Sequence, residues 1–467
     1  MQRNSPKATW GLIICLTSLT ACNSLQFESP REAHDLQSPP SWEASSSGRE
    51  GKITQGWLSD FSDPGMTAAV ERAMAYNSDL AAAAARMREA EYIRIAGQSR
   101  TLPNVALSSS GAYSMAGNGS APTTESERYG LNISASWEVD VWKRLRDLNE
   151  ASQADVDALR ALYRGARLSL AASTAKSWCN LIAAEQQLEL AKVTLDSFES
   201  NLRISERNYI GTGQGSLDVQ FGRTNVASAR RALEARRLER DDAARGLETL
   251  SGQYPSGRSS AGSDLPNMKR SVPAGIPADM VERRPDLEVA RARIYASAKR
   301  ADAIRKNLLP NIRLTSSGGN SVAQFQDLFD PNWLAASIAA SVAQSVYSGG
   351  ELTNLAHAAV ERNKELIADY TQTALIAYRE VESALSADDS LRAQEEFLIQ
   401  EVKQAALAEK QATRDYADGI EGSDILDVLE AQRRNNNAKA SLIRLRNERL
   451  QNRIDLHLAL GGDFKTA

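Results

Sequence analysis

The sequence contains little cysteine and little histidine, and this scarcity excludes several kinds of site. Its 467 residues include three of each: Cys15, Cys22 and Cys179, and His34, His357 and His457. The histidines are scattered, with no cysteine or carboxylate at the spacing of a zinc site. Gly211–Ser216 resembles a phosphate-binding loop only in its glycines, because it follows a predicted helix and lacks the Gly-Lys-Ser/Thr ending. The sequence therefore predicts no metal site, no bound cofactor and no enzyme activity.

An excess of charge of one sign is also absent. The chain has 55 Lys and Arg against 59 Asp and Glu, a formal net charge of −4, so its composition gives no reason to expect nucleic acid as a partner. Aromatic residues make up only 6%, whereas Ala, Leu, Arg and Glu are plentiful. This composition is typical of long helices.

The N-terminus has the features of a bacterial export signal. Arg3 and Lys7 precede an apolar run, Gly11–Leu19, that is too short to cross a bilayer as a helix. The run ends in Leu-Thr-Ala-Cys22, which resembles a lipobox. We predict that residues 1–21 are a lipoprotein signal peptide and that Cys22 carries covalent lipid, the alternative being an ordinary signal peptide with an incidental cysteine.

The residues after Cys22 indicate where the protein is sent. In bacterial lipoproteins an aspartate after the lipidated cysteine retains the protein at the inner membrane, so Asn23 indicates the outer membrane. Ser29–Lys52 is rich in Ser, Pro and Glu, and we predict that residues 22–63 form an extended, lipidated N-terminal tether. Only Cys179 remains as a free thiol, so no intramolecular disulfide is expected, and its Ala-rich surroundings predict a buried, apolar role.

The chain is an internal duplication. Leu102–Gly111 (LPNVALSSSG) reappears as Leu309–Gly318 (LPNIRLTSSG), 207 residues later, and Tyr209 and Tyr416 keep the same offset. Each half has a helix, two strands joined by a loop, a very long helix, a glycine-containing turn and a returning helix. We predict repeats over residues 64–261 and 262–467.

Two strands in each half are predicted from alternation. Tyr129, Leu131, Ile133, Ala135, Trp137 and Val139 share one face, and Leu334, Ala336, Ile338, Ala340 and Val342 share one in the second half. Each run reaches about 10 residues, enough for a tilted transmembrane strand, although a soluble sheet with one wet face would alternate similarly. Aromatics at the expected strand ends (Tyr113, Tyr129, Trp333, Tyr347) suit the interfaces of a membrane, and Ser114–Arg128 and Asn320–Asn332 are expected to be polar loops.

The predicted helices are unusually long. Glu351–Asp418 contains no glycine or proline, and Leu145–Asn208 contains only Gly165, so each would extend about 100 Å. Opposite each long helix we expect two shorter helices laid end to end, which bring the chain back along its length. These are Leu217–Ser251 with Ala278–Leu308, and Asp427–Leu460 with Pro64–Arg100.

Four strands per chain predict an oligomer. Open sheet edges in lipid leave unpaired N–H and C=O groups that cost several kcal/mol each. Two chains would give eight strands, which is too narrow for a water-filled lumen, and three would give twelve. The strand count argues for an oligomer, but it does not by itself select three chains.

These features resemble the TolC-like outer-membrane efflux proteins, in the lipoprotein branch that serves RND-type pumps. The residues that carry the resemblance are the two Leu-Pro-Asn motifs, Val272–Pro277 (VPAGIP), Arg283–Leu287 (RRPDL), Leu458–Gly462 (LALGG) and the tip motifs Tyr209–Val219 and Tyr416–Gln432. The resemblance implies an α+β membrane protein. It would be a homotrimer whose 12-stranded β-barrel, with four strands per chain, is continuous with a long α-helical barrel in the periplasm. Its implied partners are a periplasmic membrane-fusion adaptor, an inner-membrane pump and outer-membrane lipid.

The family further implies a gate at the helix tips. Asp427 and Glu430 match the motif whose acidic residues ring the constriction, and their spacing places them on one helical face. Rings of three carboxylates would be plugged by divalent or cationic ligands. The alternative is a solvated acidic face near a helix N-terminus, and for Asp424 capping is the better explanation.

The same resemblance assigns Asp218 and Tyr416 to a hydrogen-bonded lock on the closed tip. A basic residue usually completes this lock after the glycine of the second tip, but Ile-Glu-Gly follows Gly419, and the second tip is one or two residues longer than the family pattern. Arg207 and Arg414 are the candidate substitutes.

The predicted function is therefore a passive outer-membrane exit duct of a tripartite efflux system for drugs, toxic compounds or metal ions. The alternatives are a type I protein secretion duct and a periplasmic coiled-coil adaptor lipoprotein. The cargo is not encoded in these motifs.

Overall fold

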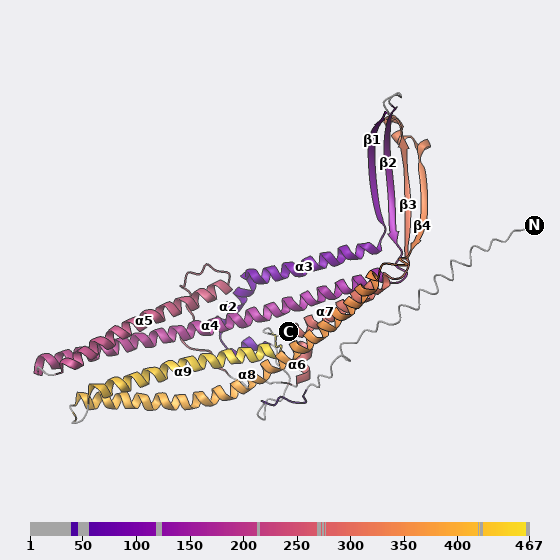
Figure 1. The fold of residues 1–467 in the computed structure, drawn as a ribbon. Helices are drawn as coiled ribbons and strands as arrows, with labels where there is room; N and C mark the ends of the chain where they lie inside the picture. The colour runs from indigo at the N-terminus through magenta and orange to yellow at the C-terminus, as the bar shows by residue number, and fades with distance from the viewer. Residues whose placement is uncertain are drawn as a thin grey trace, which may run out of the picture. The chain divides into compact units, whose positions relative to one another are not determined.

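The computed structural model describes residues 39–44, 56–117, 124–212, 215–268, 277–418 and 424–463, together with Val272, Gly275 and Ile420 (Figure 1). The predicted signal peptide and Cys22 lie outside these residues. The described chain is mostly helical with one sheet, and it divides into two compact units. Unit 1 contains Ala85–Ala161 and Val289–Gln372; unit 2 contains Gln37–Ala84, Leu162–Glu288 and Thr373–Ala467. Each unit takes segments from both halves of the duplicated chain.

The sheet of unit 1 has four antiparallel strands in chain order. They are β1 (Asn104–Ala116), β2 (Thr124–Glu138), β3 (Asn311–Val322) and β4 (Ala335–Ala343). β1 and β2 come from the first half and β3 and β4 from the second, and the pair β2–β3 joins the halves through pairs such as Leu131 with Asn320. β1 and β4 are therefore the two edges of the sheet.

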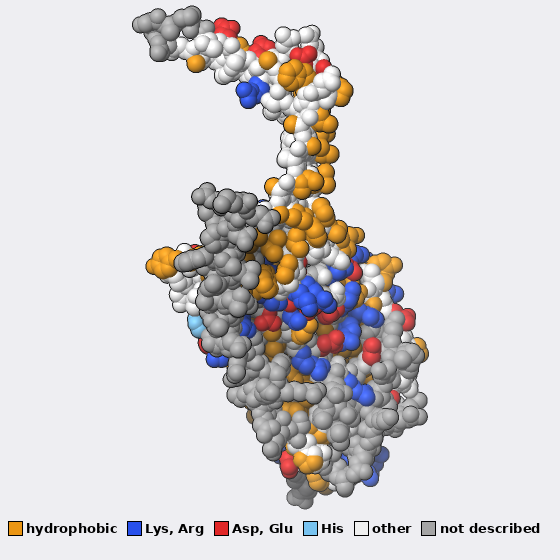
Figure 2. All heavy atoms as spheres, turned by 90° about the vertical axis from the view of Figure 1, so that its right-hand side faces the viewer, with side chains coloured by type: hydrophobic (Ala, Val, Ile, Leu, Met, Phe, Trp, Pro, Cys, Tyr) orange, Lys and Arg blue, Asp and Glu red, His pale blue; other side chains and the backbone are white. Residues whose placement is uncertain are grey.

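The two faces of the sheet differ in polarity, as the alternation predicted. Leu107 pairs with Ile133 and Gly318 with Ala336 on the apolar face, whereas Ser108 pairs with Asn132 and Ser317 with Ser337 on the polar face. The apolar side chains are exposed in the single chain. Figure 2 shows hydrophobic side chains along the sheet, whereas Lys, Arg, Asp and Glu gather mainly over the helices.

The strand connections differ from the prediction. β2 begins at Thr124, so much of the expected loop Ser114–Arg128 is strand, and Tyr129 lies inside β2 rather than at its end. The second connection forms two 3-10 turns, η4 (Phe325–Phe329) and η5 (Pro331–Trp333). Phe325 packs edge-on against Tyr129 at 5.5 Å between ring centroids, which explains why this loop is less polar than expected.

The long helices confirm the prediction from missing glycine and proline. α4 (Arg144–Thr212) has 69 residues and α8 (Glu351–Ala417) has 67. The returning helices α5 (Ser216–Leu250) and α9 (Ile425–Ala459) have 35 each. Among the described residues, no helix combines the length and apolar character needed to cross a membrane.

Two helices that were expected to be continuous are broken. Residues 64–98 form α2 (Pro64–Tyr76) and α3 (Ser78–Gln98), followed by the turn η3 (Ser99–Thr101). Residues 277–306 form α6 (Pro277–Arg283) and α7 (Pro285–Lys306). The breaks at Asn77 and Arg284 are 207 positions apart, the offset of the duplication. Asn77 has an extended backbone and caps α3 by accepting from the Leu80 N–H, and Pro285 disfavours helical geometry at Arg284.

The ends of the returning helices contact these breaks in corresponding ways. The Asn77 amide donates to the Leu250 carbonyl at the end of α5 (3.1 Å). The Arg284 guanidinium donates to the Ala459 carbonyl at the end of α9 (3.0 Å) and also pairs with Glu380 of α8 (2.8 Å). Each break is thus stabilised by capping the helix that ends beside it.

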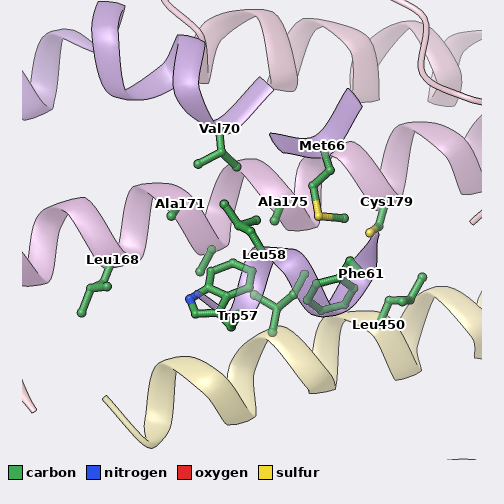
Figure 3. Close-up of a cluster of buried hydrophobic side chains, with 12 residues drawn as sticks. Trp57, Leu58, Phe61, Met66, Val70, Leu168, Ala171, Ala175, Cys179 and Leu450 are labelled. Carbon is green, nitrogen blue, oxygen red and sulfur yellow. The ribbon is translucent and has the colours of Figure 1, made fainter. Parts of the chain in front are cut away.

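The main hydrophobic cluster of unit 2 lies between α4, α9 and the start of the folded chain (Figure 3). Trp57 and Phe61 of the turn η2 (Trp57–Phe61) pack with Met66 of α2, Cys179 of α4 and Leu450 of α9. Cys179 is buried, as expected, and burial raises the pKa of its thiol to about 12.

The predicted tether is not entirely an extended linker. Trp42 is 4% exposed and packs against Tyr378 in a tilted arrangement, with 6.2 Å between ring centroids. The N–H groups of Glu43 and Ala44 donate to the Glu382 carboxylate (3.0 and 2.8 Å). Burial of Trp42 and of η2 therefore fixes two points of a segment whose composition alone indicated no packing.

Candidate functional site

The candidate site is the tip of unit 2, where α4 turns into α5 and α8 turns into α9. α9 begins with a capping box: Leu426 N–H donates to Asp424 Oδ1 (3.4 Å) and Asp424 N–H donates to Asp427 Oδ2 (3.3 Å). Asp424 is therefore a cap, as expected. Asp427 has a capping role as well, because a carboxylate in the first turn satisfies N–H groups that have no partner in the helix.

The first turns of α9 have one buried and one exposed face. Ile425, Val428 and Gln432 are buried, whereas Asp427 is exposed and Glu430 is half-exposed. Asp427 and Glu430 thus share the outward face, as their spacing predicted.

Glu430 is paired with two arginines of the next turn. Arg433 donates through Nε to Oε2 and through Nη2 to Oε1, both at 2.8 Å, and Arg434 Nε donates to Oε1 at 2.6 Å. Arg434 and then Arg433 lower the pKa of Glu430. The motif comparison did not identify these arginines, although their spacing at i+3 and i+4 was readable in the sequence.

Asp218 occupies the corresponding place in the first hairpin. It lies in the first turn of α5, after Gly215, whose φ of 87° is left-handed. Leu217-Asp218-Val219 and Leu426-Asp427-Val428 are 209 residues apart, so the lock candidate and the gate candidate are duplicates of each other. Burial, followed by the charge of Asp424, raises the pKa of Asp218.

Tyr416, the other lock candidate, is half-buried near the end of α8. Within the described residues of this single chain, no hydrogen bond joins it to Asp218. The tyrosines 209 and 416 are 207 residues apart and the two aspartates 209 apart, so the two extra residues of the second tip lie between Tyr416 and Asp427. The predicted pairing of Tyr416 with Asp218 therefore stays a prediction.

Behind the tips, buried polar side chains of α9 join it to α4 of the other hairpin and to α8 of its own hairpin. Gln432, 3% exposed, bonds Asn201 (3.0 Å) and Ser197 (3.1 Å) of α4, and Asn435 of α9 donates to Glu409 of α8. Sequence reasoning missed these residues, because a glutamine or asparagine in a helix gives no sign of a buried partner on another helix.

The described tip contains no metal cluster. Across the described residues, no group of three or more His, Cys, Asp or Glu side chains is arranged to hold a metal ion.

Known proteins similar in sequence to this chain are outer-membrane efflux proteins. Residues 69–253 and 276–462 match the family model described as outer membrane efflux protein. The pyoverdine export outer membrane protein OpmQ of Pseudomonas putida is 29% identical over 440 residues, which cover 91% of this chain and 92% of that protein. The cation efflux system protein CusC of Escherichia coli O6:H1 is 26% identical over 417 residues, 88% of each chain.

A solved structure shows the same fold. The outer-membrane channel OprN superposes with a TM-score of 0.85 at 23% identity, covering 95% of this chain and 99% of that one. The four-stranded sheet and the long helical hairpins are therefore the fold of a TolC-like channel.

Proposed function

The chain belongs to the outer membrane efflux protein family, and from this premise we propose how its parts make a gated duct. The protein is an outer-membrane exit duct of an efflux system, and it extends into the periplasm. The family match and the sheet favour this function over a coiled-coil adaptor.

The observation that carries the proposed assembly is the four-stranded sheet with two free edges. β1 and β4 each present one unpaired edge, and one face of the sheet is apolar. Three copies would pair β4 of one chain with β1 of the next and close a twelve-stranded barrel, with apolar side chains toward lipid and serines toward the lumen. We therefore propose a homotrimer.

The N-terminus supplies a second attachment. Lipid on Cys22 would anchor each chain in the outer membrane, and the packed residues Trp42 and Trp57 then fix the following chain to the helical part. We further propose that a periplasmic membrane-fusion adaptor and an RND-type inner-membrane pump complete the system. Transport through this protein would be passive, with small-molecule cargo chosen by the pump.

The gate is proposed at the exposed face of α9. In a threefold assembly Asp427 and Glu430 would each form a ring, with the Asp218 and Tyr416 region holding the neighbouring hairpin tip. The exposed position of Asp427 and its place at the extreme end of the hairpin support this assignment.

The test is conductance of the purified trimer in a planar bilayer, with single cysteines at the tip. Cys179 is buried and its thiol pKa is raised, so Asp427→Cys and Glu430→Cys introduce the reactive thiols. We expect a bulky neutral maleimide to reduce conductance at both positions, and to leave conductance unchanged at Glu234→Cys on the exposed surface of α5. Labelling at 427 and 430 without loss of conductance would place the gate elsewhere, and failure to form conducting trimers would reject the duct.

A further inference from the structure

We propose that Arg433 and Arg434 set the charge selectivity of the tip, so that the duct passes anionic cargo and does not retain divalent cations there. This inference rests on the proposed function, namely that the exposed face of α9 lines the constriction. It reverses the expectation that acidic rings alone would be plugged by cations.

The Glu430 carboxylate is already engaged by two guanidinium groups. Arg433 approaches it with two nitrogens at 2.8 Å, one to each oxygen, and Arg434 adds a third contact at 2.6 Å. A guanidinium that engages both oxygens of a carboxylate is a strong, geometrically specific pair. A divalent cation would have to displace both arginines before it gained these oxygens as ligands.

Two further carboxylates lie at the start of α9. Asp427 accepts the Asp424 N–H and Asp424 accepts the Leu426 N–H, so both already serve as caps of the helix N-terminus. From Asp424 to Arg434 the chain carries three negative and two positive side chains. In three copies the arginines therefore offset two of every three negative charges, which weakens the field that would favour cations.

Both arginines remain accessible to a passing molecule. The Arg433 and Arg434 side chains are 63% and 73% exposed although they contact Glu430. Each guanidinium has five N–H donors, and Glu430 engages only part of them. The remaining donors suit carboxylate, phosphate or sulfonate groups, which they bind through paired hydrogen bonds. The ligand class that follows is a small organic anion.

The same chain offers a matched control for these two residues. Arg236 and Arg237 are also adjacent arginines, and they pair with Glu239 (2.5 Å) and Glu234 (2.6 Å) three residues away on α5. They lie about six helical turns from the Gly215 end of that helix, away from the tip. Replacing them removes the same charge without changing the tip.

The experiment compares wild type, Arg433→Gln with Arg434→Gln, and Arg236→Gln with Arg237→Gln in planar bilayers. The readouts are the reversal potential in a KCl gradient and block of the current by added Mg²⁺. We expect weak ion selectivity and little block for wild type and for the control. For the tip variant we expect cation preference and Mg²⁺ affinity to rise by about fivefold or more, because even one charge removed close to the ion path has an effect of about this size in water and the variant removes two from each chain.

A second variant should change the ion selectivity in the opposite direction. Glu430→Gln leaves both arginines free, so it should make the channel anion-selective and increase current inhibition by citrate. The proposal is overturned if wild type is already strongly cation-selective and Mg²⁺-blocked, or if neither tip variant differs from the control. Those results would leave the proposed duct function intact, because the channel would still conduct. If the wild-type protein did not conduct at all, both the duct function and the role of the arginines in selectivity would be rejected.

Discussion

At the residue scale, the duplication preserves backbone contacts while the side chains diverge. Glu248 of α5 and His457 of α9 are 209 positions apart, and each main-chain carbonyl accepts a corresponding hydrogen bond, from Gln253 N–H (2.8 Å) and Gly462 N–H (3.0 Å). The buried His457 ring stacks on Trp57, with 5.8 Å between centroids. Burial and the charge of Arg453 lower its pKa to about 3, so the imidazole is neutral. Glu248 instead stays charged.

Glu248 organises the loop after α5. It is 2% exposed, and its carboxylate accepts from the N–H groups of Gly257 (2.8 Å), Arg258 (3.0 Å) and Ser259 (2.9 Å) and from the Ser256 hydroxyl (3.1 Å). Burial raises the pKa of this carboxyl, but the hydrogen bonds outweigh burial and lower the pKa to about 2. The structure thus stabilises the charged form.

A pH-dependent effect of Glu248→Gln follows from this pKa. We expect the variant to lose about 2 kcal/mol of unfolding free energy at neutral pH, because an amide replaces the charged acceptor. Since the folded pKa lies below the unfolded value, the wild-type advantage is complete above about pH 4.5 and is lost as pH falls toward 2. Thermal unfolding followed by circular dichroism across this range measures it. Glu239→Gln, at an exposed ion pair, should change little at any pH, and an equal loss in both variants would contradict the assignment.

At the element scale, the helix joints show what sequence reasoning supplied and what it did not. The four strands and the long helices α4 and α8 were predictable because alternation and the absence of glycine and proline act locally. The break at Arg284 was also readable, from Pro285. The break at Asn77 was not, because its partner is the Leu250 carbonyl, 173 residues away in the chain. The tip shows the same difference between local and distant features. The spacing of Asp427 and Glu430 was enough to predict that they share one helical face, whereas the contacts of Gln432 depend on α4, which is distant in the sequence.

Glycines complete the two joints. Gly252 and Gly461, just after α5 and α9, have φ values of 67° and 68°. A Cβ on Gly252 would lie 2.4 Å from the Tyr76 carbonyl oxygen, and one on Gly461 would lie 3.2 Å from backbone atoms of Arg283 and Arg284. Both glycines therefore allow a helix end to approach the backbone of the break closely.

A ranked series of alanine variants tests these joints. Gly349 also has positive φ (61°), but nothing lies within 4 Å of its Cβ position, so Gly349→Ala should cost only the left-handed strain of about 1 kcal/mol. Gly461→Ala should cost about 2 kcal/mol and Gly252→Ala about 3 kcal/mol, because contact with backbone atoms is added. Melting temperatures should fall in this order, and equal losses at the three positions would show that packing at the breaks contributes nothing.

At the scale of the whole molecule, the single chain leaves surfaces that only assembly can cover. Ile338 of β4 is 86% exposed and Leu107 of β1 is 72% exposed, although both are apolar. A soluble monomer rarely exposes such a continuous apolar face. Lipid against this face removes the cost of exposing apolar side chains to water. Pairing of β1 with β4 between copies removes the cost of unpaired N–H and C=O groups at the sheet edges.

Two adjacent positions of β4 separate the roles of the faces. Ile338 lies on the apolar face, whereas Ser337 lies on the other face, with its hydroxyl 2.9 Å from that of Ser317. A lysine facing lipid near the bilayer centre costs about 2–4 kcal/mol, but a lysine facing a water-filled lumen costs little. We therefore expect Ile338→Lys to reduce the detergent-extracted, heat-modifiable trimer in outer membranes, and Ser337→Lys to leave its amount unchanged while shifting ion selectivity toward anions. If the two lysines reduced the amount of trimer equally, the assignment of one face to lipid and the other to the lumen would be wrong. The proposed twelve-stranded barrel would then be wrong as well.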